Sequence, residues 1–323
     1  MKPAIFCLSA IILTTSFASY ATSLSDKKPY KLVVPFPAGG GADIIARTIS
    51  DELARNLGQK IIVENRAGAG GSLGTEWALR EKADGRTLIY VTNGTLCVNP
   101  VLYPKIGYDV NQDIEPVSRL TDIALVMAIN PQKLPVRNLG DFLAYAQKSA
   151  TALTFSSAGN GTSSHLAGVL LSQLTNVPFE HIPYRGGAAS ITDVLAGRID
   201  FTIDVAPNVW PHVQAGRLLA LGTGSKFNSN SLHSLKTIEE QGVKGYELFA
   251  WDGIAVKKGT PENVVKIIDA AIQKTLANKE VRERLLSRGA NPVHATPEEF
   301  NTFVQSEQNK WRNIVKSSKT TLN

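Results

Sequence analysis

A chain of 323 residues is long enough for two domains, and its 43% hydrophobic and 19% charged residues are typical of a globular protein. The formal net charge is +6, but the basic residues are scattered along the chain, which argues against a nucleic-acid-binding surface. With only two cysteines, the chain does not have the composition of a fold stapled by disulfides.

The first residues predict an export signal. Lys2 gives a positive start, residues 5–13 are apolar, and small residues follow as far as Ala21. This order is typical of a secretory signal peptide over residues 1–21, cleaved near Ala21, and its apolar stretch is too short to span a bilayer. We therefore expect an exported protein in which Cys97 is the remaining cysteine. Because an exposed lone thiol is unusual outside the cytoplasm, we expect Cys97 to be buried.

Strands and helices alternate in the first part of the mature chain. Short apolar runs predict strands, and apolar residues at helical spacing predict amphipathic helices between them. The expected strands are 31–34, 60–63 and 87–91, and the expected helices are 43–57 and 73–80. This alternation predicts a parallel sheet covered by helices.

A second alternating series follows a linker-like stretch near Asn130 and Pro131. Its expected strands are 153–155, 179–182, 201–203 and 218–223, and its expected helices are 141–148, 164–174 and 188–196. The C-terminal part is helical. A cap at Thr260 precedes a helix over 264–276, and a capping box that begins at Thr296 precedes a helix over 300–315.

The C-terminal helices have no strand after them, so we expect them to pack on the first sheet. The prediction is therefore an α/β fold with a discontinuous domain 1, residues 22–129 plus 252–323, and a domain 2 over residues 130–251. The chain would cross between the domains twice. Two crossings form a hinge, and ligands favour clefts between domains.

Three glycine-rich turns each follow an expected strand and precede an expected helix. They cover residues 37–43, 158–163 and 184–188. Each turn would leave free backbone N–H groups at the positive end of a helix dipole, which is a site for an anion. No Gly-Lys-Ser/Thr sequence follows them, so they are not nucleotide-binding P-loops. We expect them to bind a small anion, a carboxylate in particular.

Each turn also has a purely structural interpretation, which the sequence leaves open. We expect Asp43 to be the N-cap of the first helix. The hydroxyls of Thr162 and Ser163 could bind a ligand or only cap a helix, and His165 could be structural. Arg185 could bind a carboxylate with its guanidinium fork or be a solvated surface charge.

A different class of function, a secreted serine hydrolase, rests on Ser72. Residues 70–74 match the Gly-x-Ser-x-Gly nucleophile elbow. However, the elbow places its serine at the tip of a strand, whereas residues 65–71 separate Ser72 from the nearest expected strand. No triad is marked. The histidines and cysteines are isolated, so we expect no metal and no cofactor.

Several segments together resemble the Bug family, the extracytoplasmic solute receptors of tripartite tricarboxylate transporters. The resemblance runs from about Tyr30 to the C-terminus. The segments that carry it are Pro35-Phe36-Pro37-Ala38-Gly39-Gly40-Gly41-Ala42-Asp43, Glu64-Asn65-Arg66-Ala67-Gly68-Ala69-Gly70-Gly71-Ser72, Asp84-Gly85-Arg86-Thr87-Leu88, Ser157-Ala158-Gly159-Asn160-Gly161, Pro183-Tyr184-Arg185-Gly186-Gly187, Gly259-Thr260-Pro261 and Thr296-Pro297-Glu298-Glu299-Phe300.

The resemblance implies a type II-like periplasmic binding protein whose two domains close around one ligand carboxylate. We expect a monomer in the periplasm, a binding protein rather than an enzyme. Its partners would be membrane transporter subunits or, alternatively, a membrane sensor kinase. The expected ligand-binding residues are Phe36, Pro37, Ala38, Gly39, Gly40, Gly41, Ala42, Asp43, Thr92, Asn93, Gly161, Thr162, Ser163, His165, Tyr184, Arg185, Gly186 and Asp204.

The ligand itself stays open at this level. Asp204, if it faces the cleft, would repel a second carboxylate and could accept a hydrogen bond from an amino or amide group. Arg185 would favour a second carboxylate. Because these two residues point to opposite chemistries, amino acids, dicarboxylates and aromatic acids all remain candidates.

Overall fold

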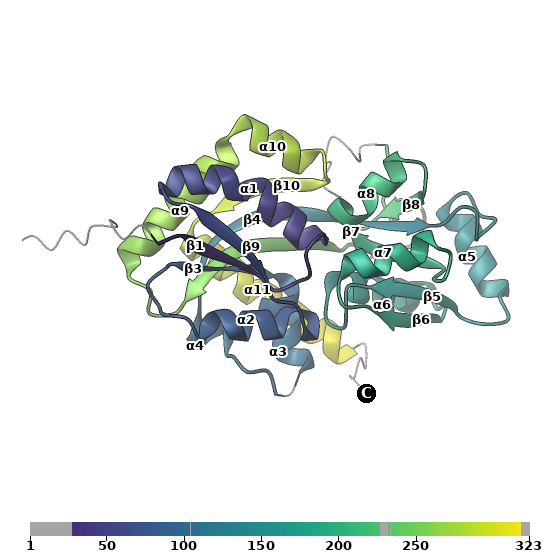
Figure 1. Cartoon of the computed structure of the whole chain (residues 1–323). Helices are drawn as coiled ribbons and strands as arrows, with labels where there is room; N and C mark the ends of the chain where they lie inside the picture. The colour runs from purple at the N-terminus through teal and green to yellow at the C-terminus, as the bar shows by residue number, and fades with distance from the viewer. Residues whose placement is uncertain (1–27, 104, 227–231, 233, 318–323) are drawn as a thin grey trace, which may run out of the picture.

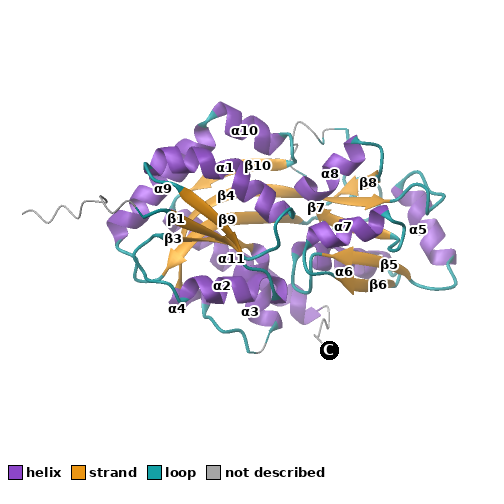
Figure 2. Ribbon diagram, in the orientation of Figure 1, coloured by secondary structure: helices purple, strands orange, loops and turns teal. Residues whose placement is uncertain are grey.

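The computed structural model describes residues 28–103, 105–226, 232 and 234–317 (Figure 1). The predicted signal peptide lies outside the described residues. The elements are, in chain order (Figure 2), β1 (Tyr30–Val34), α1 (Gly41–Leu57), β2 (Ile61–Asn65), η1 (Ala69–Gly71), α2 (Ser72–Leu79), β3 (Thr87–Thr92), η2 (Gly94–Val98), α3 (Asn99–Leu102), α4 (Val110–Asp113), β4 (Ile114–Ile129), α5 (Leu139–Lys148), β5 (Leu153–Ser157), α6 (Ser163–Thr175), β6 (Phe179–Pro183), α7 (Gly187–Leu195), β7 (Phe201–Val205), α8 (Ala206–Gln214), β8 (Leu219–Thr223), β9 (Phe249–Lys257), α9 (Glu262–Ala277), α10 (Lys279–Leu286), β10 (Ala290–Ala295) and α11 (Pro297–Ser317).

The strands form one continuous sheet in the order β2-β1-β3-β9-β4-β7-β5-β6, and β8 and β10 both pair with β4. The outer strands are parallel: β1 pairs with β2 and β3, and β5 pairs with β6 and β7. The central strands β9 and β4 run antiparallel to their neighbours. Each half of the molecule therefore has a parallel series, as the alternating pattern predicts, and antiparallel strands join the halves.

The long strand β4 connects the two halves (Figure 1). Up to Ala124 it pairs with β9 and β10, and from Leu125 onward it pairs with β7 and β8. The chain returns to the first half at β9, which begins at Phe249. The predicted domain boundary lies at residue 129/130, the end of β4, whereas the strand pairing changes inside β4. The exact division into domains stays a prediction.

Helix α1 shows why the sequence folds as it does in the first half. Ile45, Ile49 and Leu53 recur at intervals of one helical turn, and all three are fully buried. The helix ends at Gly58, whose φ of 67° lies in the left-handed region that favours glycine. Helix α1 packs against α9, which brings the C-terminal part of the chain back onto the first half.

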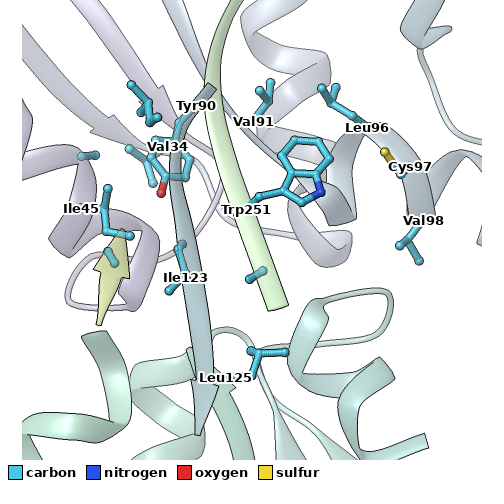
Figure 3. Close-up of a cluster of buried hydrophobic side chains, with 14 of the residues drawn as sticks. Val34, Ile45, Tyr90, Val91, Leu96, Cys97, Val98, Ile123, Leu125 and Trp251 are labelled. Atoms are coloured by element: carbon cyan, nitrogen blue, oxygen red, sulfur yellow. The ribbon is translucent and has the colours of Figure 1, made fainter. Parts of the chain in front are cut away.

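One cluster of buried side chains extends through the first half and the junction into the second half. Figure 3 shows Tyr90, Ile123 and Trp251 in this cluster of buried side chains. Cys97 is fully buried there, which confirms the prediction for this residue. The indole Nε1 of Trp251 donates a hydrogen bond of 3.0 Å to Glu307 on α11. The central strands are therefore tied to the C-terminal helix.

Among the described residues, no helix combines the length and the apolar character needed to cross a membrane.

A candidate carboxylate site between the two halves

A cavity lies between the two halves of the molecule. It lies at the carboxyl ends of the parallel strands, where ligands of open α/β sheets bind. Residues from both halves line it, namely Phe36, Pro37, Gly40, Gly41, Ala42, Tyr90, Thr92, Asn93, Ile123, Ala158, Thr162, Ser163, Ser164, Gly187, Asp204, Val205, Ala250 and Trp251.

Helix N-termini converge on this cavity. Helices α1, α6 and α7 begin with Gly41, Ser163 and Gly187, which all line it, and α8 begins directly after the lining residue Val205. The first turn of a helix has N–H groups without intrahelical partners, and each helix carries about +0.5 of an elementary charge at this end. Backbone groups alone therefore make the cavity suitable for an anion.

Asp43 stabilises the first glycine-rich turn through hydrogen bonds. The N-cap of α1 is Gly40, so the prediction that Asp43 is the N-cap is wrong; Asp43 lies in the first helical turn. Its carboxylate accepts hydrogen bonds from the N–H of Gly39 (2.9 Å) and from Arg47 and Asn65. Burial alone would raise the pKa of Asp43, but the hydrogen bonds from these three groups lower it below its ordinary value. Asp43 therefore shapes the turn as an ionised acceptor.

The second turn is built by its own hydroxyls. Thr162 Oγ1 donates a hydrogen bond to the carbonyl of Gly159 (2.6 Å). Ser164 Oγ accepts from the N–H of Ala158 (2.9 Å) and lies 3.0 Å from Thr162 Oγ1. Both hydroxyls are engaged within the turn. The donors that remain for a ligand at this end of α6 are therefore chiefly the backbone N–H groups.

His165 also supports the second turn. Its Nδ1 accepts a hydrogen bond from the N–H of Gly161 (3.3 Å), and its ring stacks on His181 at 4.1 Å between centroids. Burial lowers the pKa of His165 to about 4, so the ring is neutral at pH 7 and can accept this hydrogen bond. Neither His165 nor Gly161 is among the residues that line the cavity.

The third turn divides between two places. Gly187 lines the cavity, whereas Tyr184, Arg185 and Gly186 line a separate groove on the other side of Phe36 and Pro37. The hydroxyl of Tyr184 donates a hydrogen bond of 2.6 Å to Asp193. Arg185 is exposed. Its contact with a ligand stays a prediction, and its position is outside the cavity.

Asn93 offers the cavity a side-chain donor. It is 1% exposed, and its Oδ1 accepts a hydrogen bond of 2.9 Å from Ser163 Oγ of the other half. This bond fixes the amide so that Nδ2 is a buried donor with no partner among the described residues. A buried donor without a partner costs free energy, which a ligand oxygen would recover.

Asp204 lies in the cavity wall at the end of β7. Its Oδ1 accepts from the N–H of Val205 (2.8 Å) and its Oδ2 from Asn208 Nδ2 (2.7 Å). Burial raises the pKa of Asp204 to about 6, and the two hydrogen bonds oppose this effect. Gly187 packs so closely against Asp204 that a Cβ there would lie 2.7 Å from Oδ2.

The remaining wall is apolar and comes from the strands that join the halves. Tyr90 and Ile123 lie on β3 and β4, and Ala250 and Trp251 lie on β9. The Tyr90 hydroxyl donates a hydrogen bond to buried Asp252. Sequence reasoning missed these four lining residues. They are ordinary core residues in the sequence, and only the antiparallel pairing of β9 with both β3 and β4 brings them together.

The three glycine turns contact the opposite half of the molecule. At Gly41 a Cβ would overlap Cγ2 of Val205, and at Gly161 it would overlap Oδ1 of Asn99. At Gly186 it would lie 2.7 Å from the ring of Pro37. Glycine is therefore needed at each turn for the halves to approach this closely.

The structure brings together ten of the predicted site residues at the cavity: Phe36, Pro37, Gly40, Gly41, Ala42, Thr92, Asn93, Thr162, Ser163 and Asp204. The others, Ala38, Gly39, Asp43, Gly161, His165, Tyr184, Arg185 and Gly186, lie in the supporting turns or in the neighbouring groove. Ligand contact by any of them stays a prediction.

The hydrolase alternative finds no support in the surroundings of Ser72. Ser72 begins α2, is buried, and accepts a hydrogen bond of 2.9 Å from Asn99. Among the hydrogen bonds of the described residues, none joins Ser72 to a histidine. A serine–histidine hydrogen bond does occur between Ser157 and His181, but Ser157 is fully buried.

The fold and the cavity between its halves define a two-domain solute-binding protein of the periplasmic type. Residues 45–319 match the model of the tripartite tricarboxylate transporter family receptors, TctC. The chain belongs to this family, which is a family of substrate-binding receptors whose members include the Bug proteins.

Relatives match over nearly the whole chain. A protein from the tcbD–tcbE intergenic region of a Pseudomonas is 34% identical over 95% of this chain and 91% of its own length. BugT of Bordetella pertussis is 32% identical over 90% of this chain and 89% of its own length.

Solved structures agree in fold. The periplasmic binding protein BugD has a TM-score of 0.86 at 30% identity, over 91% of this chain and 98% of its own. A protein of R. palustris solved with adipate gives 0.88 at 29%, over 91% and 98%. MatC of Rhodopseudomonas palustris, solved with malate, gives 0.83 at 31%, over 89% and 98%. The predicted two-domain periplasmic binding protein fold is thereby confirmed.

Proposed function

We propose that this protein is a periplasmic receptor that binds a small carboxylate in the cavity between its halves. The observation that carries the proposal is the convergence of four helix N-termini on one cavity, together with the unpartnered amide donor of Asn93. A carboxylate would accept hydrogen bonds from both kinds of donor. Two solved relatives hold adipate and malate, which supports the same ligand class.

In this proposal the protein binds its ligand and does not transform it. The halves close on the carboxylate, and the closed form delivers it to the membrane subunits of a tripartite tricarboxylate-type transporter. The match to the receptor family supports this partnership. Uptake of the ligand by cells should require both this protein and the membrane subunits. Uptake that is unchanged without the protein would contradict the transport role and leave ligand binding intact.

Ligand binding is tested by thermal unfolding against a panel of monocarboxylates and dicarboxylates at pH 7.5. Each acid is paired with its neutral amide as a control. A ligand that binds only the folded state stabilises it by RT ln(1 + [L]/Kd), about 2.7 kcal/mol at 100 times Kd. We expect stabilisation by acids and not by their amides. Stabilisation by amides, with no effect of any acid, would overturn the proposal.

A further inference from the structure

We propose that the cavity selects an acid with one carboxylate and an uncharged apolar body, and that Asp204 excludes a second carboxylate. This inference rests on the proposed function, because it assigns a ligand class to the same cavity. In the sequence, Arg185 favours a ligand with a second carboxylate and Asp204 disfavours one. In the structure, Asp204 lines the cavity, whereas Arg185 lines the neighbouring groove.

The first argument is the charge of the wall. Among the described residues that line the cavity, none is a lysine, arginine or histidine. The positive potential therefore comes from the N-termini of α1, α6, α7 and α8, at about +0.5 each, or about +2 together. Asp204 balances about half of this when ionised. One ligand carboxylate balances the rest, and a second would leave an excess of negative charge in a water-poor site.

The second argument is the surface that faces the ligand body. Phe36, Ile123, Val205, Ala250 and Trp251 supply apolar wall. The nearby Tyr90 hydroxyl already donates its hydrogen bond to Asp252, so it is not a donor for a second carboxylate at the other end of the ligand. An apolar body gains free energy on this surface, whereas a charged group would lose its hydration without a new partner.

The third argument is the position of Asp204. Both of its oxygens accept hydrogen bonds from its own half, from the N–H of Val205 and from Asn208 Nδ2. These bonds fix the carboxylate in the wall, and burial keeps water from screening it. A second carboxylate that entered the cavity would therefore face an immobile like charge.

The test compares matched acids by titration calorimetry at pH 8, where Asp204 and all ligands are ionised. The pairs are hexanoate with adipate and benzoate with terephthalate. We expect the monocarboxylate to bind at least 10-fold more tightly in each pair that binds. Asp204→Asn should reduce this ratio several-fold by admitting the dicarboxylate. The control Glu262→Gln, an exposed acid on α9, should leave the ratio unchanged.

The outcomes separate this inference from the proposed function. If a dicarboxylate binds as tightly as its partner or more tightly, or if other acids stabilise the protein but none of these four binds, the selectivity is overturned and the receptor function stands. If no carboxylate binds at all, both the selectivity and the proposed receptor function are overturned. If the ratio of the two affinities is unchanged in Asp204→Asn, Asp204 is not the residue that excludes the second carboxylate. If that variant does not fold, Asp204→Ser replaces it, and the wild-type ratio alone still decides the selectivity.

Discussion

Asn93 is the residue through which a ligand would contact a side-chain donor of the first half. Its Nδ2 is buried without a partner among the described residues, and a hydrogen bond to a charged group contributes about 1.5–3 kcal/mol. We therefore expect Asn93→Ala to weaken carboxylate binding by roughly 10- to 100-fold in titration calorimetry.

A matched variant separates this donor from the contact between the halves. Ser163→Ala removes only the hydroxyl that donates to Asn93 Oδ1 and leaves the amide in place. We expect it to cost less affinity than Asn93→Ala. Equal losses in the two variants would show that the bond between the halves, and not the free donor, matters for binding.

Asp252 makes stability depend on pH. Burial raises its pKa to about 7 from 3.8, while hydrogen bonds from Thr121 and Tyr90 oppose the shift. Between these values the folded protein keeps a proton that the unfolded chain releases. The contribution of Asp252 to the free energy of unfolding is therefore complete below pH 4 and falls by about 1.4 kcal/mol per pH unit up to about pH 7.

Urea unfolding of wild type and Asp252→Asn between pH 4 and 8 checks this effect. Between pH 4 and about pH 7, the free energy of unfolding of the wild type should fall relative to that of the variant by about that slope. All other ionisable groups are common to both proteins, so the difference between the two curves isolates Asp252. Asp109→Asn is the control, because Asp109 is exposed and asparagine caps α4 equally well. Parallel curves for wild type and Asp252→Asn would contradict the assignment.

At the scale of elements, helix α1 has a start that only glycine allows when the halves are together. Gly41 has no positive φ, so alanine there introduces no backbone strain, but its Cβ would overlap Val205 Cγ2 of the other half. We expect Gly41→Ala to weaken ligand binding at least 10-fold while the melting temperature of the free protein stays within a few degrees. The added Cβ hinders the closure of the two halves and does not affect folding.

The double-mutant cycle with Val205→Ala checks this explanation. Removing Cγ2 of Val205 removes the overlap, so Gly41→Ala should cost much less affinity in the Val205→Ala background than in wild type. Additive losses would show that Gly41 contributes to binding directly, through its position at the start of the helix.

The elements that the sequence predicted best are those whose pattern is local. Residues 31–34 and 43–57 agree with β1 and α1, because an apolar run or a helical period is visible within them. The elements that were not predicted include β4, α8 and, in the C-terminal part, α10 and β10. Strand β10 follows α9 and α10 and pairs with β4, so the expectation that no strand follows the C-terminal helices is wrong. Strand β4 contains Pro116, and its residues are stabilised by partners from both halves. Helix α8 contains Pro211, which local rules place outside helices.

The candidate site shows the same limit. The glycine turns could be found because strand, turn and helix follow one another in the chain. It was not possible to predict that Thr162 Oγ1 donates to Gly159 within the turn, or that Trp251 would face the cavity. The first depends on the turn's three-dimensional path, and the second depends on the pairing of strands far apart in sequence.

At the scale of the whole molecule, the described contacts are those of a closed form. Tyr103 donates to the carbonyl of Asn160 at 3.3 Å, Ser163 donates to Asn93 at 2.9 Å, and Gly41 packs on Val205. These contacts join the halves around the cavity, while the chain itself passes between the halves within β4 and on the approach to β9. Rotation about these two passages would break these contacts and open the cavity.

We therefore expect the free protein to be more open in solution than its complex with a carboxylate. Small-angle X-ray scattering should give a smaller radius of gyration with saturating ligand, and the curve of the complex should match the structure described above. Gly41→Ala should remain open at ligand concentrations that close the wild type, because its added Cβ opposes the last approach of the halves. Superimposable curves for free and liganded wild type, at a ligand concentration that calorimetry shows to be saturating, would mean that the ligand enters without domain closure.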